Sequence, residues 1–403
     1  MKVYIITKEP FPNGMAAVKR IVCYAKAWIS QGIECEVLIY TRTEVYGKKP
    51  KNTVGKGVYE RIPFCYVKGT PLRESNIIIR RINDYCDRYR LKRYLKKYLL
   101  AGDVVYAYNG CDPYSFEIQK IAHLCGALYM QELCELPFGT SEETPKRIKL
   151  RTAFEHKVMP KLDGVIAISD ALVNYARQHC SANACIMKVP ILVDFPQYEM
   201  IDRSDEADVP YIFHSGTLSQ QKDGFLDMLE AFAKASKRLP FDVRFISTGN
   251  PKETKHEKAI SEIIDKYNIR EKVQFAGYLP NNELCEYLSK ATFVVINKLT
   301  TKQNKYCFST KLGEYMAASK AIIITRVGEA MNWLTHEKDA FIIEPNNTDV
   351  LAYAMERMFS DEKLRKTLGD NACRTCKEKF SIEGNSTIIK KIIESKNKKK
   401  KLI

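Results

Sequence analysis

Short apolar runs alternate with longer amphipathic segments along almost the whole chain. The apolar runs have the length of buried strands, and the segments between them repeat apolar positions at helical spacing. In the first half, strands are predicted at residues 3–7, 34–40, 61–67, 104–108, 127–132, 164–168 and 184–189, and helices at 15–31, 76–100, 114–124 and 145–159. Alternation of this kind is typical of parallel sheets with crossover helices.

A second series of the same kind begins at residue 211. Its predicted strands are 211–217, 242–248, 273–275, 293–297, 321–325 and 340–343, and its predicted helices are 225–239, 255–267, 281–289, 350–359 and 362–379. The acidic, weakly periodic segment 195–210 predicts a linker. The sequence therefore predicts an α/β protein with two Rossmann-like, doubly wound parallel-sheet domains at 1–194 and 211–380. Residues 381–403 are predicted to form a final helix and a basic tail. Ligands of such sheets bind at strand carboxyl ends, which places the expected site in a cleft between the domains.

Composition narrows the class of protein. The 403 residues are 45% hydrophobic and 28% charged, which is typical of a globular protein and sufficient for two cores. No apolar run approaches the roughly 20 residues of a membrane-spanning helix. Thirteen cysteines without a secretory signal favour a reducing, cytoplasmic compartment over a disulfide framework.

The net charge of +16 predicts an anionic partner, and part of it lies in the predicted helix 76–100. This helix interleaves cations with apolar and aromatic residues; the cations are Arg80, Arg81, Arg88, Arg90, Lys92, Arg93, Lys96 and Lys97. Such a pattern fits an interfacial helix on an anionic membrane, and equally a surface helix with one stripe facing the core. No nucleic-acid-binding motif accompanies the charge, so nucleic acid is not an expected partner.

Residues 304–329 contain the most informative candidate site. Ser309 and Thr310 mark the start of a helix that carries Lys311 and Glu314 in its first turns. A helix N-terminus presents unpaired N–H groups that suit a phosphate, and a carboxylate one turn later suits the hydroxyls of a ribose. The alternative is an ordinary helix packed on a strand, with a solvated Glu314.

Further loops follow predicted strands and contain glycine or charged residues; these candidates are Gly14, Gly216, Thr217, Lys222, Gly249, Gly277, Glu132 and Glu135. A lysine near a helix start can act as a point charge on a diphosphate. A carboxylate in a short apolar loop, as predicted for Glu132 and Glu135, can serve as an acid–base catalyst or bind a sugar hydroxyl. Taken singly, each of these residues is more often an ordinary turn or surface residue.

Several common signatures are missing from the sequence. There is no G-x-G-x-x-G, which disfavours a dinucleotide-dependent dehydrogenase, and no P-loop. The histidines show no metal-ligand spacing, and no Asp-x-Asp pair follows a predicted strand. No metal or other cofactor is therefore expected.

The ordered loops resemble those of the GT-B retaining glycosyltransferases of family 4, the group 1 type, in their bacterial branch. The resemblance covers almost the whole chain and is strongest over 211–380. Its motifs are Gly-Thr-Leu at 216–218 joined with Lys-Asp-Gly at 222–224 as one motif, Val-Gln-Phe-Ala-Gly at 273–277, Ser-Thr-Lys-Leu-Gly-Glu-Tyr-Met-Ala at 309–317 and the segments 165–170, 190–194 and 340–346. Each motif is weak alone, but six in family order are specific.

The resemblance implies roles for individual residues. Glu314 binds the donor ribose, Lys222 neutralises the leaving diphosphate, and Gly277 lines the base pocket. The implied donor-binding set is Gly14, Gly216, Thr217, Lys222, Gly249, Gly277, Ser309, Thr310, Lys311 and Glu314, and the catalytic candidates are Lys222, Glu135 and Glu132. The final helix is expected to cross back to the first domain.

Three departures from the family pattern concern the sugar end and the diphosphate. A family glutamate eight residues before Glu314 is replaced by Tyr306, and a family arginine is replaced by Thr217. The usual first-domain histidine is absent, and Glu132 or Glu135 occupies its loop. Diphosphate stabilisation then rests on Lys222, backbone dipoles and Lys311 or Arg326.

The sequence thus predicts a metal-independent, retaining glycosyltransferase of the hexosyltransferase type. Its expected donor is a nucleotide-diphosphate sugar, and its expected acceptor is a saccharide or lipid-linked saccharide in cell-surface polysaccharide or glycoconjugate synthesis. The expected location is the cytoplasm, with peripheral contact at the inner face of the membrane. The alternatives are a catalytically altered nucleotide-sugar binder and an epimerase or phosphorylase of the same fold.

Overall fold

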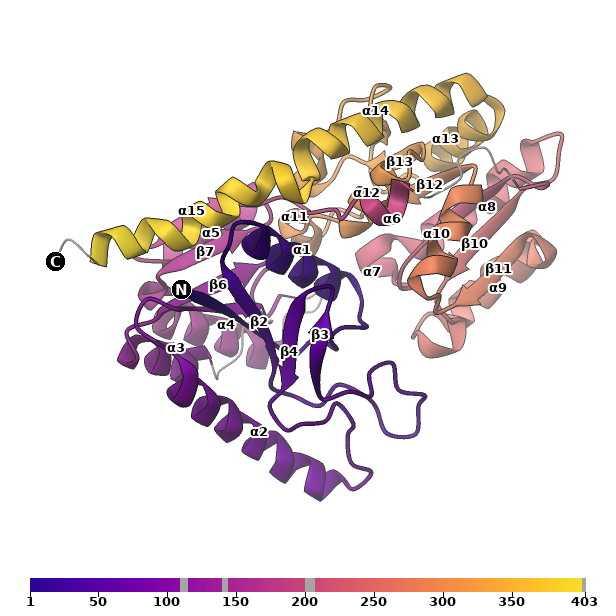
Figure 1. Cartoon of the computed structure of the whole chain (residues 1–403). Helices are drawn as coiled ribbons and strands as arrows, with labels where there is room; N and C mark the ends of the chain where they lie inside the picture. Colours follow the sequence, from indigo (N-terminus) through magenta and orange to yellow (C-terminus); the bar gives the residue numbers. More distant parts are fainter. Residues whose placement is uncertain (109–114, 140–143, 200–206, 401–403) are drawn as a thin grey trace. The chain divides into compact units, whose positions relative to one another are not determined.

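The computed structural model describes residues 1–108, 115–139, 144–199 and 207–400, and the chain divides into two compact units (Figure 1). The first unit is Met1–Leu192 together with Ile382–Ile403, and the second is Val193–Ser381. Residues 195–210, predicted as a linker between the domains, fall within the second of these units. Seven residues of the predicted linker, 200–206, lie outside the described residues.

The sheet of the first unit has the order β3-β4-β2-β1-β5-β6-β7-β8. Its strands are β1 (Lys2–Thr7), β2 (Glu34–Ile39), β3 (Lys56–Tyr59), β4 (Ile62–Tyr66), β5 (Val104–Tyr108), β6 (Leu128–Leu133), β7 (Gly164–Ala167) and β8 (Cys185–Lys188). The pairings are parallel apart from the β3–β4 hairpin. Because its central strands are buried on both faces, they appear in the sequence as continuous apolar runs.

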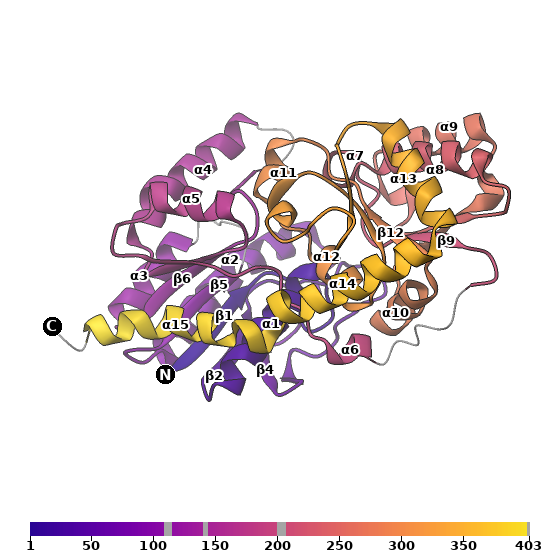
Figure 2. The same ribbon diagram turned by 90° about the horizontal axis from the view of Figure 1, so that it is seen from above.

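Helices cover the sheet of the first unit. They are α1 (Ala16–Ser30), α2 (Ile77–Tyr98), α3 (Ser115–Leu124), α4 (Pro145–Lys157), α5 (Asp170–His179) and α15 (Ile382–Lys400). The C-terminal helix α15 packs along α1, as Figure 2 shows, and Trp28 Nε1 donates to Ile389 O at 3.3 Å. The expected return of the last helix to the first unit is therefore confirmed.

The second unit contains a parallel sheet of order β11-β10-β9-β12-β13-β14. Its strands are β9 (Tyr211–His214), β10 (Arg244–Thr248), β11 (Val273–Gly277), β12 (Phe293–Ile296), β13 (Ile322–Thr325) and β14 (Phe341–Ile343). Its helices are α6 (Pro196–Glu199), α7 (Gln220–Asp223), α8 (Phe225–Arg238), α9 (Glu257–Tyr267), α10 (Asn281–Lys290), α11 (Lys302–Tyr306), α12 (Thr310–Ala317), α13 (Thr348–Ser360) and α14 (Glu362–Phe380). The apolar faces of α8, α9 and α13 form its core with the strands.

Each sheet has a point at which the strand order reverses. In the second unit the chain moves outward from β9 to β11 and then returns to place β12 on the other side of β9. In the first unit β5 returns to the free side of β1. Loops leaving the two central strands diverge at such a point, and ligands of doubly wound sheets bind there. The carboxyl ends of β9 and β12 therefore define the first place to look for a site.

Most predicted elements are confirmed within two or three residues, but some elements were not predicted. The strand β3 was missed because its turn residues Glu60 and Arg61 adopt positive φ values of 47° and 68° without the usual Gly or Asn signal. The helix α5 was also missed, although Ser169 caps it. Part of the predicted linker is the short helix α6, and the turns α7 and α11 lie in segments predicted as loops.

Candidate functional site

The switch point of the second unit brings together the ends of β9 and β12 and the start of α12. After β9 ends at His214, the chain continues through Ser215 and Gly216, and α12 is fixed to this loop by Tyr315. Ser215 N donates to Tyr315 Oη at 2.9 Å, and Ser215 Oγ lies 3.0 Å from the same oxygen. These buried hydrogen bonds set the position of the first turn of α12, and therefore the position of Lys311.

A buried carboxylate at this point is shared by two ammonium groups. Asp223, 4% exposed at the end of α7, lies 2.7 Å from Lys298 Nζ through Oδ1 and 3.1 Å from Lys311 Nζ through Oδ2. Lys298 follows β12 and also donates to Lys222 O at 2.9 Å. Two cations on one carboxylate leave an excess positive charge, which suits an anionic ligand.

The electrostatics of the cluster keep Asp223 ionised. Burial pushes the pKa of Asp223 upward, but the ammonium groups of Lys311 and Lys298 outweigh burial and hold that pKa well below its usual range. Burial lowers the pKa of Lys311, and Asp223 opposes this shift. The ion pair with Asp223 therefore helps Lys311 to remain charged.

His214 lies beside these cations at the end of β9. It is 1% exposed, and neither ring nitrogen has a hydrogen-bond partner within the described part of the chain. Burial, and then the charge of Lys311, lower the pKa of His214 to about 3, so its ring is neutral at physiological pH. A Cβ atom at position 216 would overlap Lys311 Nζ, so the glycine at this position allows the ammonium to approach the loop backbone.

The low pKa of His214 predicts a pH-dependent stability. Because the folded protein holds this ring neutral down to about pH 3, only the unfolded chain takes up its proton between pH 6.5 and 3. The free energy of unfolding should therefore fall by about 1.4 kcal/mol for each unit by which the pH is lowered through this window. Denaturant titrations from pH 7 to 4.5 should show this slope in the wild type and a shallower one in His214→Asn. Parallel profiles in the two proteins would contradict a neutral, buried His214 next to Asp223, Lys298 and Lys311.

The start of α12 adds backbone donors to the cluster. The predicted helix start is confirmed, with Ser309 as N-cap residue and Thr310 as first helical residue. The Ser309 side chain makes no capping hydrogen bond, and the helix dipole is positive at this end. Glu314 lies one turn further along and is half-buried. The four predicted residues of this helix therefore lie in one stretch next to the Asp223 cluster.

The glycine loops after β10 and β11 lie next to one another and to the loop after β9. Gly249 N donates to Gly277 O at 3.1 Å, and Gly249 approaches Gly216 O and the Leu218 side chain. Thr217 Oγ1 lies 3.5 Å from Asp223 Oδ2, and Lys222 is half-buried at the end of α7. The structure thus brings the predicted glycine loops and Thr217 next to the Asp223 cluster, whereas Arg326 pairs with Glu344 at 2.7 Å instead.

The first unit contains the remaining candidates, of which Gly14 has a local explanation. A Cβ at position 14 would overlap the Val18 side chain and lie 2.6 Å from Pro10 O, so its own loop already requires glycine. Glu135 is exposed in the loop after β6. Nothing in the geometry of the first unit assigns a ligand to Gly14.

The prediction that Glu132 lies in a loop is wrong. Glu132 is the fifth residue of β6 and is 5% exposed. Its Oε1 lies 2.8 Å from Arg20 Nε, and its Oε2 accepts a hydrogen bond from Tyr106 Oη. Arg20 also donates to Pro190 O at 2.5 Å and to Val189 O at 3.0 Å. Glu132 therefore joins α1, β5, β6 and the end of β8, and this geometry favours a structural over an acid–base role.

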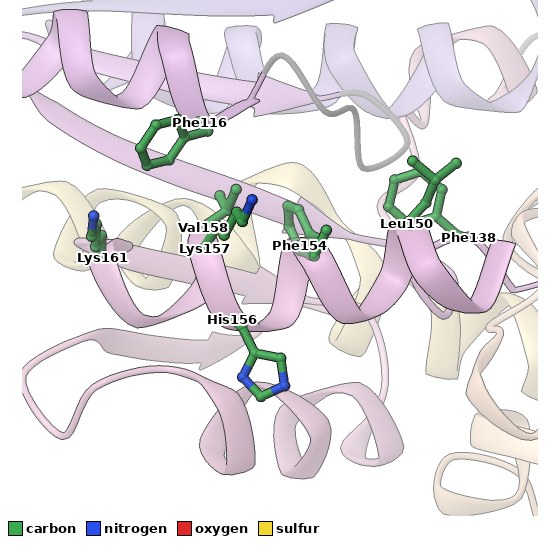
Figure 3. A pocket seen from close by; sticks show the side chains of 9 residues that line it. Phe116, Phe138, Leu150, Phe154, His156, Lys157, Val158 and Lys161 are labelled. Carbon is green, nitrogen blue, oxygen red and sulfur yellow. The ribbon is translucent and has the colours of Figure 1, made fainter. Parts of the chain in front are cut away.

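An apolar cavity of about 480 Å³ lies in the first unit, and Figure 3 shows its lining. Phe116 comes from the start of α3, while Phe154 comes from α4 and Val158 follows it. Lys157 and Lys161 also line the cavity. Its walls are suited to an apolar group with a nearby anion.

The described residues contain no group of three or more His, Cys, Asp or Glu side chains that could hold a metal ion. Their cysteines are free thiols. No helix among the described residues is long and apolar enough to span a membrane.

Sequence reasoning missed three members of the cluster: His214, Asp223 and Lys298. Each is at or just beyond the carboxyl end of an element that meets the switch point. A charged residue two positions after the apolar run of β12 was the available signal for Lys298. Recognising it required the strand order, because β9 and β12 are about 80 residues apart in sequence and adjacent only in the sheet.

The comparisons with known proteins point to one family for this unit. Residues 199–375 match the model of the glycosyl transferases group 1 family. A lipopolysaccharide core biosynthesis glycosyltransferase, LpsD of Rhizobium meliloti, is 29% identical over 123 residues, or 30% of this chain and 34% of that protein. The curated relatives align with this chain over only 34 to 42% of their own length.

Solved structures extend the likeness to both units. The sucrose-phosphate synthase of Thermosynechococcus elongatus superimposes with a TM-score of 0.74 at 16% identity, over 98% of this chain and 99% of that one. HepE of Anabaena in complex with UDP-glucose gives 0.72 at 14% identity, over 98% and 100%. At these identities the likeness shows the GT-B fold. The family match covers residues 199–375, less than half of the chain, and relates that segment to the glycosyl transferases group 1 family.

Proposed function

We propose that this chain is a metal-independent, retaining glycosyltransferase of the hexosyltransferase type that uses a nucleotide-diphosphate sugar as donor. The observation that carries the proposal is the pair Lys298 and Lys311 on the single buried carboxylate of Asp223. This cluster lies at the switch point of the unit that matches the glycosyl transferases group 1 family. The complex of Anabaena HepE with UDP-glucose supports a nucleotide sugar as donor.

The cluster is suited to a leaving diphosphate. Sugar transfer breaks the bond between the anomeric carbon and the diphosphate oxygen, and negative charge develops on that oxygen. Fixed ammonium groups and helix N–H donors stabilise such charge without having to reorganise. Lys311 and the uncapped start of α12 supply both, and Lys222 adds a third ammonium near the end of α7.

Asp223 acts as a positioning residue in this scheme. Its two oxygens hold Lys298 and Lys311 at 2.7 and 3.1 Å, so both long side chains are fixed before a donor arrives. Preorganisation lowers the entropy cost of binding and the reorganisation cost of catalysis. The neutral ring of His214 adds no further cation, which limits repulsion in the empty site.

The structure offers more candidate residues for the nucleotide of the donor than for its sugar. Glu314 is half-buried one turn into α12, a position suited to ribose hydroxyls, and Gly249 and Gly277 form adjacent loops suited to the base. At the sugar end Tyr306 stands where the family has a glutamate. We therefore propose Glu314, Gly249 and Gly277 as the residues that bind the nucleotide of the donor.

The first unit is proposed to take the acceptor, a saccharide or lipid-linked saccharide. The cavity lined by Phe116 and Phe154, with Lys157 and Lys161 beside it, suits an apolar group that carries an anion. The exposed Glu135 is the better of the two acid–base candidates because the carboxylate of Glu132 is buried in an ion pair. The likeness to LpsD supports a place in cell-surface polysaccharide or glycoconjugate synthesis.

Tyr306 also favours a second candidate function. Without the family glutamate, the same fold can serve as a nucleotide-sugar binder that does not transfer. This alternative shares the donor site but predicts binding without turnover. An assay of nucleotide release separates the two.

The test of the proposed function is nucleotide release from a panel of UDP-, GDP-, ADP- and CDP-sugars, with a chelator present. We expect release from at least one donor. Both Lys222→Ala and Glu314→Ala should lower it about a hundredfold, because each removes a charged contact to the donor. The exposed Glu283→Ala on α10 is the matched control and should retain wild-type release. Near-normal nucleotide release by both Lys222→Ala and Glu314→Ala, with folding verified by circular dichroism, would contradict the proposal that this site binds the donor.

A further inference from the structure

The helix α2 in the first unit is attached to its unit by ion pairs over its first half. Arg42, which follows β2 and is 1% exposed, pairs through Nε with Asp87 at 3.1 Å and through Nη2 with Asp84 at 3.2 Å. Arg90 Nη1 lies 2.7 Å from the other oxygen of Asp87. The first buried apolar residue of the helix is Leu91. The inner face of the first half of this helix is therefore ionic.

The outward face of α2 carries the apolar residues. Ile78, Ile82, Tyr85 and Tyr89 are 69%, 58%, 71% and 65% exposed. Their spacing of four, three and four residues places them on one stripe of the helix, on the side opposite Asp87. The usual amphipathic arrangement is inverted, because the stripe that would normally face a core faces solvent.

Further residues of α2 lengthen and flank this stripe. Ile77 and Ile79 are also exposed, at 58% and 48%, and Asn76 caps the helix because its Oδ1 accepts hydrogen bonds from Ile78 N and Ile79 N. The helix carries eight Lys or Arg side chains and two Asp, and both Asp are paired with Arg42. Figure 1 shows α2 running along the outside of the first unit.

We propose that the outward face of α2 is a docking surface for an anionic lipid bilayer. Isoleucines insert among acyl chains, tyrosines suit the interface, and the flanking cations meet lipid phosphates. A second copy of this chain is disfavoured because it would bring the same excess of positive charge onto the stripe. A nucleic acid would use the cations but leave the isoleucines in water.

Under this proposal, residues 76–100 follow the interfacial interpretation of their sequence. The contact is reversible, because a short apolar stripe inserts only shallowly and the charge attraction is screened by salt. It does not depend on the proposed transfer activity. It also offers a way to bring a lipid-linked acceptor to the unit that contains the apolar cavity.

The test is co-sedimentation of the full chain with vesicles of phosphatidylcholine alone or mixed with phosphatidylglycerol. The wild type should bind the mixed vesicles at low salt, release at high salt and bind phosphatidylcholine weakly. Ile78→Ser/Ile82→Ser and Arg81→Glu/Arg93→Glu should each weaken binding roughly tenfold or more, through loss of insertion and of charge attraction. The control Val350→Ser/Tyr353→Ser removes two exposed apolar residues of α13 in the second unit and should bind like the wild type.

Because all the altered residues are exposed or half-exposed, each variant should keep the circular dichroism of the wild type. Three outcomes would overturn the proposal. The first is an absence of binding to anionic vesicles at low salt, and the second is unchanged binding of Ile78→Ser/Ile82→Ser. The third is a dimer of the wild type that Ile78→Ser/Ile82→Ser dissociates, because the stripe would then bind a second copy of this chain. No donor enters the assay, so its failure is distinguishable from failure of the proposed transfer.

Discussion

Replacing Lys311 by alanine should lower the kcat/KM for sugar transfer about a thousandfold. This ammonium is half-buried, lies 3.1 Å from Asp223 Oδ2 and belongs to the first turn of α12, where the helix N–H groups have no side-chain cap. Its charge is therefore available where diphosphate charge develops and is poorly screened by water. Alanine keeps the helix intact, and Asp223 keeps its ion pair with Lys298, so the fold should survive.

The matched control for this change is Lys305→Ala. Lys305 is an exposed lysine of α11, six residues away in sequence, and its loss should leave kcat/KM within about twofold of the wild type. Steady-state kinetics with the donor found in the nucleotide-release panel measures both variants. Similar rates for Lys311→Ala and Lys305→Ala, with both proteins folded, would show that the Lys311 ammonium does not act on the donor.

Removing either partner of the Arg20–Glu132 pair should destabilise the first unit by about 3–5 kcal/mol. Both side chains are 2% exposed, so Glu132→Gln leaves the guanidinium charge without its buried counter-ion, and Arg20→Met does the same to the carboxylate. Burial alone would lower the pKa of Arg20, but Glu132 raises it, and the guanidinium stays charged. Denaturant unfolding of the two single variants measures the loss.

The double variant Arg20→Met/Glu132→Met distinguishes a structural pair from a catalytic carboxylate. Because it removes both charges together, it should lose less stability than the two single changes added. The fraction of Glu132→Gln that stays folded should retain most of its transfer activity. Wild-type stability combined with abolished turnover in Glu132→Gln would restore Glu132 as a catalytic residue and reject the structural role.

Much of the fold could be predicted because local and long-range signals agree. The central strands are continuous apolar runs, and Gly32 ends α1 with a φ of 74°, in the conformation expected of a glycine after a helix. The missed elements lack such signals. The hairpin β3–β4 turns through Glu60 and Arg61, and α7 is only one turn long. Periodicity cannot detect either feature.

The candidate site could be predicted only in part, for a physical reason. Ser309, Thr310, Lys311 and Glu314 are adjacent in sequence, so the start of a helix reveals them together. Asp223 and Lys298, in contrast, are 75 residues apart and meet only because β12 returns to the side of β9. A charge in a loop does not show in sequence which distant charge it will pair with. The prediction of a loop position for Glu132 was wrong for the same reason, because its partner Arg20 is 112 residues away.

Helix α2 illustrates a related limit. Its apolar spacing is that of a buried stripe, and spacing alone does not show which side of a helix faces the protein. The side is decided by Arg42, which reaches α2 from the loop after β2 and pairs with Asp84 and Asp87. These ion pairs attach the charged side to the unit and leave Ile78 and Ile82 outside.

The central claim is that the cluster of Asp223, Lys298 and Lys311 binds the diphosphate of a nucleotide. Equilibrium titration calorimetry with the diphosphate of the active donor and with the corresponding nucleoside tests it most directly. Wild type and Lys305→Ala should bind the diphosphate far more tightly than the nucleoside, and in Lys311→Ala most of that difference should disappear. Equal preference for the diphosphate in Lys311→Ala and wild type would contradict the account.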